Sequence, residues 1–307
     1  MSDWMSLLFD CRSHPLFKRQ MRIKQLGVLP FIGCTFNYTR WTHAMAVGAT
    51  AALVTRRTNT FGSMMGVAFE LAASFHDIGH HVFSHSFDNF LDKLQLPHDT
   101  HPRHEERSMA ILEVVVREVV GATTQPAEYV LNNIDAFIAL AQGYICPYGP
   151  LCSASKNAVE NPLAFLLHSD ECDIDRIDYV SRDRKLIGLG PVWPSVSQVL
   201  SELRLCSEGS RTYVYQFHGP LSDMIIQTRN KLHARVFSLV KNYDEFLFSF
   251  FNKLELQKYC DMRDPAARAV FLKYNDDNLF EIIDWYTSNI QPLCLEPPAV
   301  LQKHTLH

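Results

Sequence analysis

The sequence predicts an all-α protein with one small antiparallel β-hairpin near residues 203–217. Along most of the chain, apolar residues recur every three or four positions, which is typical of amphipathic helices. Residues 203–206 and 212–217 instead alternate between apolar and polar, and a glycine-containing turn separates them. The 307 residues contain no linker rich in Gly, Ser or Pro, so we expect a single domain over residues 1–307.

The first clear helix precedes the most distinctive stretch of the chain. Its apolar stripe consists of Phe61, Met64, Met65, Ala68, Ala72 and Phe75. A helix with this stripe buries one face and delivers His76 and Asp77 at its C-terminal end.

Four more helices are expected downstream. One begins at Pro102, and another covers about residues 126–140. Ser169 is expected to cap the next, because Asp170 and Glu171 would then lie in its first turn, where carboxylates suit the helix dipole. A long helix follows the hairpin, from about residue 220 to residue 241.

Composition narrows the class of protein. Lys+Arg number 29 against Asp+Glu 33, giving a formal net charge of -4, so no basic excess indicates a nucleic-acid surface. No apolar run approaches the ~18 residues that a membrane span needs. The eight cysteines form no CxxC pair and no secretory leader precedes them, so we expect a cytoplasmic protein with free thiols.

Two imidazoles and two carboxylates could converge on a metal ion. The pair His76–Asp77 follows the apolar helix, His43 lies upstream and Asp175 downstream. Burying Asp77 there without compensation would be costly, and a cation would remove that cost. Such ligands suit Fe, Mn, Co or Zn, and a second ion such as Mg could share the pocket. An HD dipeptide alone is common, and its simplest interpretation is a helix-end histidine beside a solvated aspartate.

Several collinear segments resemble one family. They are residues 23–27, 40–43, 76–88, 104–105, 173–183 and 228–233. Together they resemble the H…HD…D signature of HD-domain metal-dependent phosphohydrolases, and most closely the dGTPase-like deoxynucleoside triphosphate (dNTP) triphosphohydrolases. The resemblance implies an all-α HD-domain fold with a metal-site core at about 15–190, a nucleotide-contacting helix at about 220–241 and a C-terminal helical remainder.

The resemblance also implies a reaction. A metal-bound water or hydroxide would attack the α-phosphorus of a dNTP and release a deoxynucleoside and inorganic triphosphate. The metal ligands implied are His43, His76, Asp77 and Asp175.

Five further residues would act beside the metal. By resemblance, His85 donates a proton to the leaving 5′-oxygen, Asp88 orients it, and His80 contacts the α-phosphate. His104 and Glu105 would support them as a pair, although Glu105 could simply be a first-turn carboxylate that suits the helix dipole. His81 is expected at the surface.

The remaining predicted residues would hold the nucleotide. Arg229, His233 and Phe237 lie at i, i+4 and i+8, on one face of the long helix. An ordinary helix with an exposed Arg and a core Phe would have the same spacing, but the family segment favours phosphate, polar and sugar contacts. The other residues implied by the resemblance are Gln25, Leu26, Arg40, Asp173, Arg176, Tyr179 and Asp183.

Phe237 departs from the tyrosine of close relatives, so the sequence predicts neither the preferred base nor the choice between deoxyribose and ribose. Two alternatives remain. The same metal site could act on nucleoside monophosphates or another phosphoester, although Arg176 and Arg229 exceed what a monophosphate needs. The chain could also be a catalytically silent nucleotide-binding module. We expect a dNTP substrate as the main partner, and a homo-oligomer such as a dimer fits the resemblance.

Overall fold

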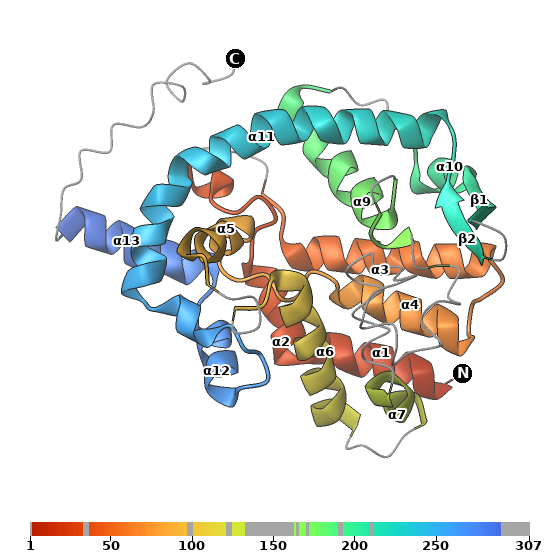
Figure 1. Ribbon diagram of the computed structural model, residues 1–307, viewed down its shortest axis with the longest axis horizontal. Helices are drawn as coiled ribbons and strands as arrows, with labels where there is room; N and C mark the ends of the chain where they lie inside the picture. The colour runs from red at the N-terminus through yellow and green to blue at the C-terminus, as the bar shows by residue number, and fades with distance from the viewer. Residues whose placement is uncertain are drawn as a thin grey trace.

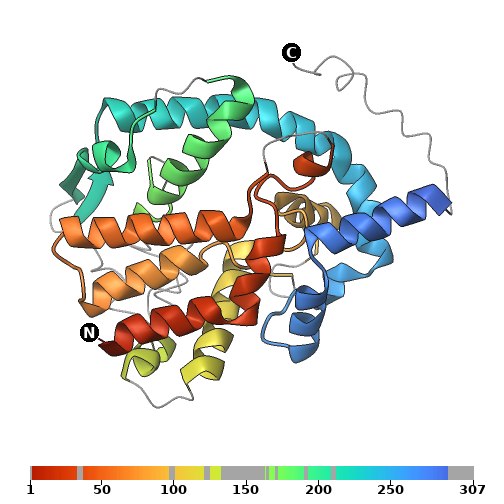
Figure 2. The ribbon, with the colours of Figure 1, turned by 180° about the vertical axis from the view of Figure 1, so that it is seen from behind.

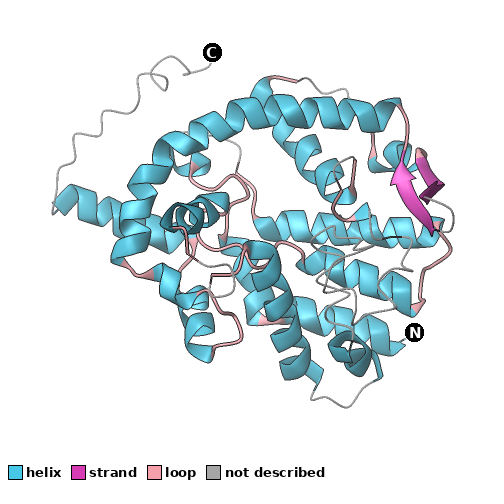
Figure 3. Ribbon diagram, in the orientation of Figure 1, coloured by secondary structure: helices cyan, strands magenta, loops and turns pink. Residues whose placement is uncertain are grey.

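In the residues that it describes, the computed structural model consists mainly of helices, with one two-stranded hairpin (Figures 1 and 3). It describes residues 2–32, 37–96, 101–120, 125–132, 163, 166–169, 172–189, 193–208 and 212–289. The α-helices are α1 (Ser2–Ser13), α2 (Pro15–Lys18), α3 (Arg40–Arg57), α4 (Met64–Phe75), α5 (His85–Leu94), α6 (His104–Val120), α7 (Gln125–Asn132), α9 (Ile174–Asp183), α10 (Val196–Leu200), α11 (Pro220–Lys253), α12 (Pro265–Lys273) and α13 (Asp276–Asn289). The hairpin pairs β1 (Leu203–Glu208) with β2 (Thr212–Phe217) in antiparallel register, which confirms the predicted fold class.

Helices α3, α4 and α9 form the part of the fold that carries the site. Figures 1 and 2 both show α3 beside α4, with α9 between α3 and the arching α11. Their buried faces belong to one large apolar cluster that includes Val47, Phe69 and Ile177. This packing stabilises the three helices whose ends meet at the site.

Capping residues fix where two of these helices begin. Thr39 caps α3 by accepting the backbone N–H of Thr42 at 3.3 Å. Ser63 caps α4 through the N–H of Gly66 at 3.1 Å. Each cap satisfies a backbone donor that would otherwise lack a partner, so helix register is set at the first turn.

The predicted cap of the fourth helix is wrong. Asp173, and not Ser169, caps α9, accepting the N–H of Arg176 at 2.7 Å through Oδ1. The second oxygen of Asp173 accepts the N–H of Ser169 at 3.0 Å. Both residue types cap helices well, and the carboxylate prevails because it satisfies two backbone donors at once.

The long helix continues further than predicted. α11 runs to Lys253 because its C-terminal half packs in a second apolar cluster, where Phe251 contacts Phe87 and Phe90 of α5 at ring distances of 5.5 Å. Of the helix predicted at 126–140, α7 covers Gln125–Asn132, and residues 133–140 lie outside the described part. None of the described helices has the length and apolarity that crossing a bilayer requires.

Candidate metal centre and nucleotide pocket

The structure brings together the four predicted metal ligands, here called the metal cluster (His43, His76, Asp77 and Asp175). His43 lies in the first turn of α3, His76–Asp77 directly after α4, and Asp175 in the first turn of α9. His43 Nε2 is 3.0 Å from Asp175 Oδ1 and 3.6 Å from Asp77 Oδ2. His76 Nε2 is 3.6 Å from the same two oxygens. Residues up to 132 positions apart thus meet around one point.

Hydrogen bonds orient both imidazoles of the metal cluster. His43 Nδ1 donates to Asp178 Oδ2 at 2.8 Å, and His76 Nδ1 donates to the carbonyl of Ala73 at 2.8 Å. The Nε2 atoms of both histidines are buried and have no hydrogen-bond partner among the described residues. Support of Nδ1 by a carboxylate or carbonyl, with Nε2 turned inward, is the usual arrangement of metal-binding histidines.

The electrostatics of the metal cluster favour a positive charge. Burial opposes protonation of His43, yet the neighbouring carboxylates of Asp175 and Asp178 outweigh it and raise the pKa to about 10. Burial likewise opposes ionisation of Asp77, but His76 and Arg40 hold its pKa well below the usual range. A divalent cation could replace the proton that these carboxylates hold on the imidazoles. Two carboxylates and two neutral imidazoles are suitable ligands for it, so the residues present fit the predicted metal.

Asp178 was not predicted from the sequence. Its position three residues after Asp175, one helical turn away, is the signal that could have identified it. Asp178 lies on the same face of α9 as Asp175, and from there it reaches His43 of α3.

A second group, here called the histidine cluster (His80, His85, Asp88 and His104), adjoins the metal cluster. The rings of His80 and His104 stack at 3.8 Å, and His85 meets His80 edge-on at 4.7 Å. Asp77 connects the two clusters, because its Oδ1 is 3.5 Å from His80 Nε2. The predicted catalytic residues therefore lie beside the predicted metal ligands.

Asp88 anchors the histidine cluster from behind. Its Oδ2 is 3.0 Å from His104 Nδ1, and its Oδ1 accepts a 2.6 Å hydrogen bond from Arg107. Burial opposes ionisation of Asp88, but Arg107 and His104 hold its pKa well below the usual range. The completely buried Arg107, one turn after His104, was also missed from the sequence. Glu105 completes the group, with Oε1 at 3.3 Å from His104 Nε2.

His85 differs from the other histidines in facing the pocket. Its side chain is exposed there, although protein surrounds it on the other sides. This partial burial and the charges of Arg40 and His104 lower its pKa to about 4. His85 is therefore neutral at physiological pH before any anion binds beside it.

Arg40 connects the metal cluster to a strained turn. The buried guanidinium pairs with Asp77, and its Nε donates to Ser84 Oγ at 2.7 Å. Its Nη2 has no hydrogen-bond partner among the described residues. Phe83 and Ser84 both have φ near +55°, an unfavourable conformation for residues other than glycine that is common at functional sites.

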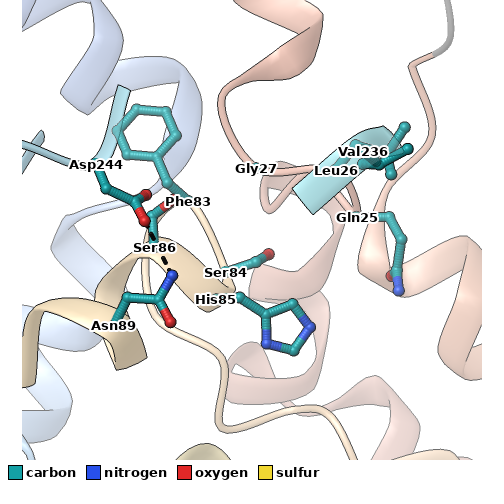
Figure 4. A pocket seen from close by; sticks show the side chains of 10 residues that line it. All are labelled: Gln25, Leu26, Gly27, Phe83, Ser84, His85, Ser86, Asn89, Val236 and Asp244. Atoms are coloured by element: carbon teal, nitrogen blue, oxygen red, sulfur yellow. Dashed lines mark hydrogen bonds between the residues drawn. The ribbon is translucent and has the colours of Figure 1, made fainter. Parts of the chain in front are cut away.

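A pocket opens next to the histidine cluster (Figure 4). It contains about 470 Å³ of space free of protein atoms, part of it open solvent. Gln25 and Leu26, both predicted to contact the nucleotide, line it together with Ser84 and His85. In Figure 4 the imidazole of His85 lies between the loop that carries Gln25 and the helix that carries Asn89.

The sequence is similar to those of three known proteins. An HD domain-containing protein of Acanthamoeba polyphaga mimivirus is 24% identical over 290 residues, covering 87% of this chain and 58% of that protein. The deoxynucleoside triphosphate triphosphohydrolase SAMHD1 of Danio rerio is 28% identical over 254 residues, and SAMHD1 of Homo sapiens is 25% identical over 249. These matches cover 75% and 73% of this chain. This chain is related to HD-domain dNTP triphosphohydrolases.

The chain spans 39% and 38% of the lengths of the two SAMHD1 proteins, so the likeness concerns only part of those proteins. No family model matches the chain. The predicted HD dipeptide, His76–Asp77, contributes both of its side chains to the metal cluster.

Two residues predicted to bind substrate, Asp173 and Arg176, have partners within the chain. Asp173 is 1% exposed, and both its oxygens accept backbone N–H groups at the start of α9. Arg176 pairs with Asp173 at 3.1 Å and donates to the carbonyl of Ser169. The two residues are three positions apart, so their side chains meet once α9 has formed.

Tyr179 and Asp183, two further residues predicted to hold the nucleotide, lie on α9. Asp183 accepts a 2.8 Å hydrogen bond from the hydroxyl of Tyr38, and burial raises its pKa to about 7. Burial and the nearby Asp175 raise the pKa of Tyr179, and Arg229 of α11 forms a hydrogen bond with it. This contact brings the predicted phosphate-binding face of α11 next to α9.

His233 is exposed on α11, one turn after Arg229. The side chain of Phe237 lies outside the described part of the structure. The prediction that His81 lies at the surface is wrong. His81 is fully buried, because its ring stacks on Phe87 at 4.3 Å and meets Phe271 at 5.4 Å.

Proposed function

We propose that the protein hydrolyses dNTPs to deoxynucleosides and inorganic triphosphate. One observation carries the proposal: two buried imidazoles turn unpaired Nε2 atoms toward two carboxylates, directly beside a second group of histidines. The relationship to SAMHD1 proteins, whose name specifies this activity, supports the substrate class. His43, His76, Asp77 and Asp175 would hold a divalent ion, which when bound polarises a phosphoryl oxygen and activates water.

The chain's own residues would bind and orient the triphosphate. Arg40 has an unpaired Nη2 next to Asp77 and would donate to an α-phosphate oxygen. His80, 3.5 Å from Asp77, would donate a hydrogen bond to the same phosphate as negative charge develops. Arg229 would pair with the outer phosphates, since a guanidinium binds phosphate oxygens well.

His85 would supply the proton that the leaving group needs. When the bond between the α-phosphorus and the 5′-oxygen breaks, an unprotonated alkoxide is a poor leaving group. The pKa of His85 is about 4, and a polyphosphate beside it would raise that value because negative charge favours the imidazolium. His104 and Asp88 would hold the neighbouring rings in place during the transfer.

The test is a product assay in water enriched in ¹⁸O, with each dNTP and with Mn²⁺ or Mg²⁺. Attack on the α-phosphorus predicts deoxynucleoside and triphosphate, with one ¹⁸O in the triphosphate. Orthophosphate or pyrophosphate as the first product would contradict the proposal. A monophosphate panel in the same assay tests the alternative substrate class, and Asp77→Asn reports contaminating phosphatases.

A further inference from the structure

The pocket has a polar end that the proposed reaction does not use. Asp244 of α11 is 5% exposed, and its Oδ2 accepts a 2.9 Å hydrogen bond from Asn89 Nδ2 (Figure 4). Asp244 Oδ1 has no hydrogen-bond partner among the described residues. The hydroxyl of Ser86, fully buried on the same wall, has none there either.

An unpaired buried carboxylate oxygen is costly, and a ligand with N–H donors would remove that cost. The hydrogen bond from Asn89 fixes the orientation of the Asp244 carboxylate. The remaining lone pairs of this carboxylate therefore point in defined directions before a ligand binds. The opposite wall of the pocket is apolar, formed by Leu26 and Val236. A flat heterocycle with N–H donors on one edge matches this combination.

The pocket is also continuous with the reaction site. His85 lines it and, on its other side, contacts His80 and His104 of the histidine cluster. A nucleotide whose α-phosphate lies near His85 could therefore extend its base toward Asp244. This step rests on the proposed function.

We propose that Asp244 reads the nucleobase and makes guanine the preferred base. A carboxylate accepts two parallel N–H donors, and guanine presents two adjacent ones, N1–H and N2–H, on one edge. Adenine and cytosine present one amino group beside an acceptor nitrogen. The lone pair of this nitrogen would face a carboxylate oxygen, and the two would repel each other. Thymine presents one N–H between two carbonyl oxygens, so it gains one hydrogen bond against two repulsive contacts.

The test measures binding and turnover separately. Affinities are determined by calorimetry for four dNTP analogues in which a methylene group replaces the 5′-oxygen, so that the bond broken in the proposed reaction is absent, and kcat/KM is determined for the four natural dNTPs. We expect guanine to exceed each other base by about 10-fold or more in both, since a site built around hydrogen bonds discriminates strongly. Hypoxanthine, which lacks the N2 amino group, should be intermediate.

Asp244→Asn then tests the residue. An amide offers one acceptor and one donor, so the guanine-to-adenine ratio should fall by about 10-fold, whereas the matched neighbour Glu245→Gln, with a 76% exposed side chain, should keep the wild-type ratio. Equal binding of all bases, preference for another base, or a guanine preference that survives in Asp244→Asn would each overturn the inference. The wild-type panel decides the first two even if the variant does not fold.

The two proposals fail separately. Hydrolysis to triphosphate without base discrimination removes the inference and leaves the function. Guanine-selective binding that depends on Asp244, without hydrolysis, removes the function and leaves the inference.

Discussion

The metal cluster and the histidine cluster share Asp77 but hold their imidazoles in opposite ways. In the metal cluster, both Nδ1 atoms are anchored at 2.8 Å and both Nε2 atoms face carboxylates. In the histidine cluster, neither nitrogen of His80 has a hydrogen-bond partner among the described residues, and His85 faces the pocket. An anchored ring suits a ligand that must stay in place, whereas a less constrained ring suits proton transfer.

The electrostatics differ in the same sense. The carboxylates of Asp175 and Asp178 raise the pKa of His43 to about 10 against the effect of burial, while burial and Arg40 lower that of His85 to about 4. The metal cluster therefore attracts a cation, whereas His80 and His85 of the histidine cluster are neutral until an anion arrives, because burial and Arg40 lower the pKa of both. Four predictions could break or sharpen this comparison.

The largest effect is expected for Asp175→Ala. Losing one of two carboxylates should lower bound metal, measured by mass spectrometry of the purified protein, to background. Turnover should fall by about 10³-fold or more, because metal activation contributes several kcal/mol. The control is Asp223→Ala, which removes an exposed carboxylate on α11. Full metal content in Asp175→Ala would show that the metal cluster is assigned wrongly.

His85→Gln should separate the two clusters. Turnover should fall by about 10²–10⁴-fold, the usual contribution of general acid catalysis, with metal content unchanged. An analogue with sulfur in place of the 5′-oxygen should restore much of the rate, since a thiolate leaves without a proton. If this analogue rescues Asp175→Ala equally well, His85 is not the proton donor.

The sequence predicted more of the apolar framework than of the contacts behind the site. The stripe ending at Phe75 located α4 because periodicity is a local property, and the hairpin followed from alternation for the same reason. The end of α11 was misplaced because its second half depends on contacts with α5, which lies about 150 residues earlier in the chain.

The candidate site shows the same limit. The four residues of the metal cluster could be named from motif order, but Asp178 and Arg107 act through neighbours that only the folded chain provides. A histidine is polar enough to be expected at the surface, but the rings of Phe87 and Phe271 bury His81. Pairing of Asp173 with Arg176 likewise required the start of α9 to be known.

Asp178→Asn should have an intermediate effect on metal affinity, because it weakens the hydrogen bond that orients His43. The amide cannot hold the imidazole as a carboxylate does, so metal affinity should fall about 10–100-fold, measured by competition with a chelator. Asp178 also pairs with Arg182 at 2.9 Å, so Arg182→Gln is the matched control and should keep the affinity. Equal losses in both variants would assign the effect to the ion pair on α9 and not to His43.

The smallest effect is expected for Asp276→Asn, because Asp276 supports the strained turn at Phe83 and Ser84 and lies outside both clusters. Asp276 accepts the backbone N–H groups of Lys24 and Phe83, both at 2.7 Å, so it connects the loop that carries Gln25 to the turn that precedes His85. An amide can accept only one of them, at a cost of about 1 kcal/mol, and a looser pocket should raise KM for the dNTP more than it lowers kcat.

The pH dependence of this variant gives the sharper test. Burial raises the pKa of Asp276 to about 7, above its usual value near 4, so folding favours the protonated form. The stability that this group contributes is complete below pH 4 and is lost as the pH rises to 7. Asp276→Asn should therefore lose less stability than the wild type between pH 5 and pH 8, measured by urea unfolding. Asp277→Asn, at the 49% exposed neighbour, should follow the wild-type curve; parallel curves for all three proteins would show that Asp276 ionises normally.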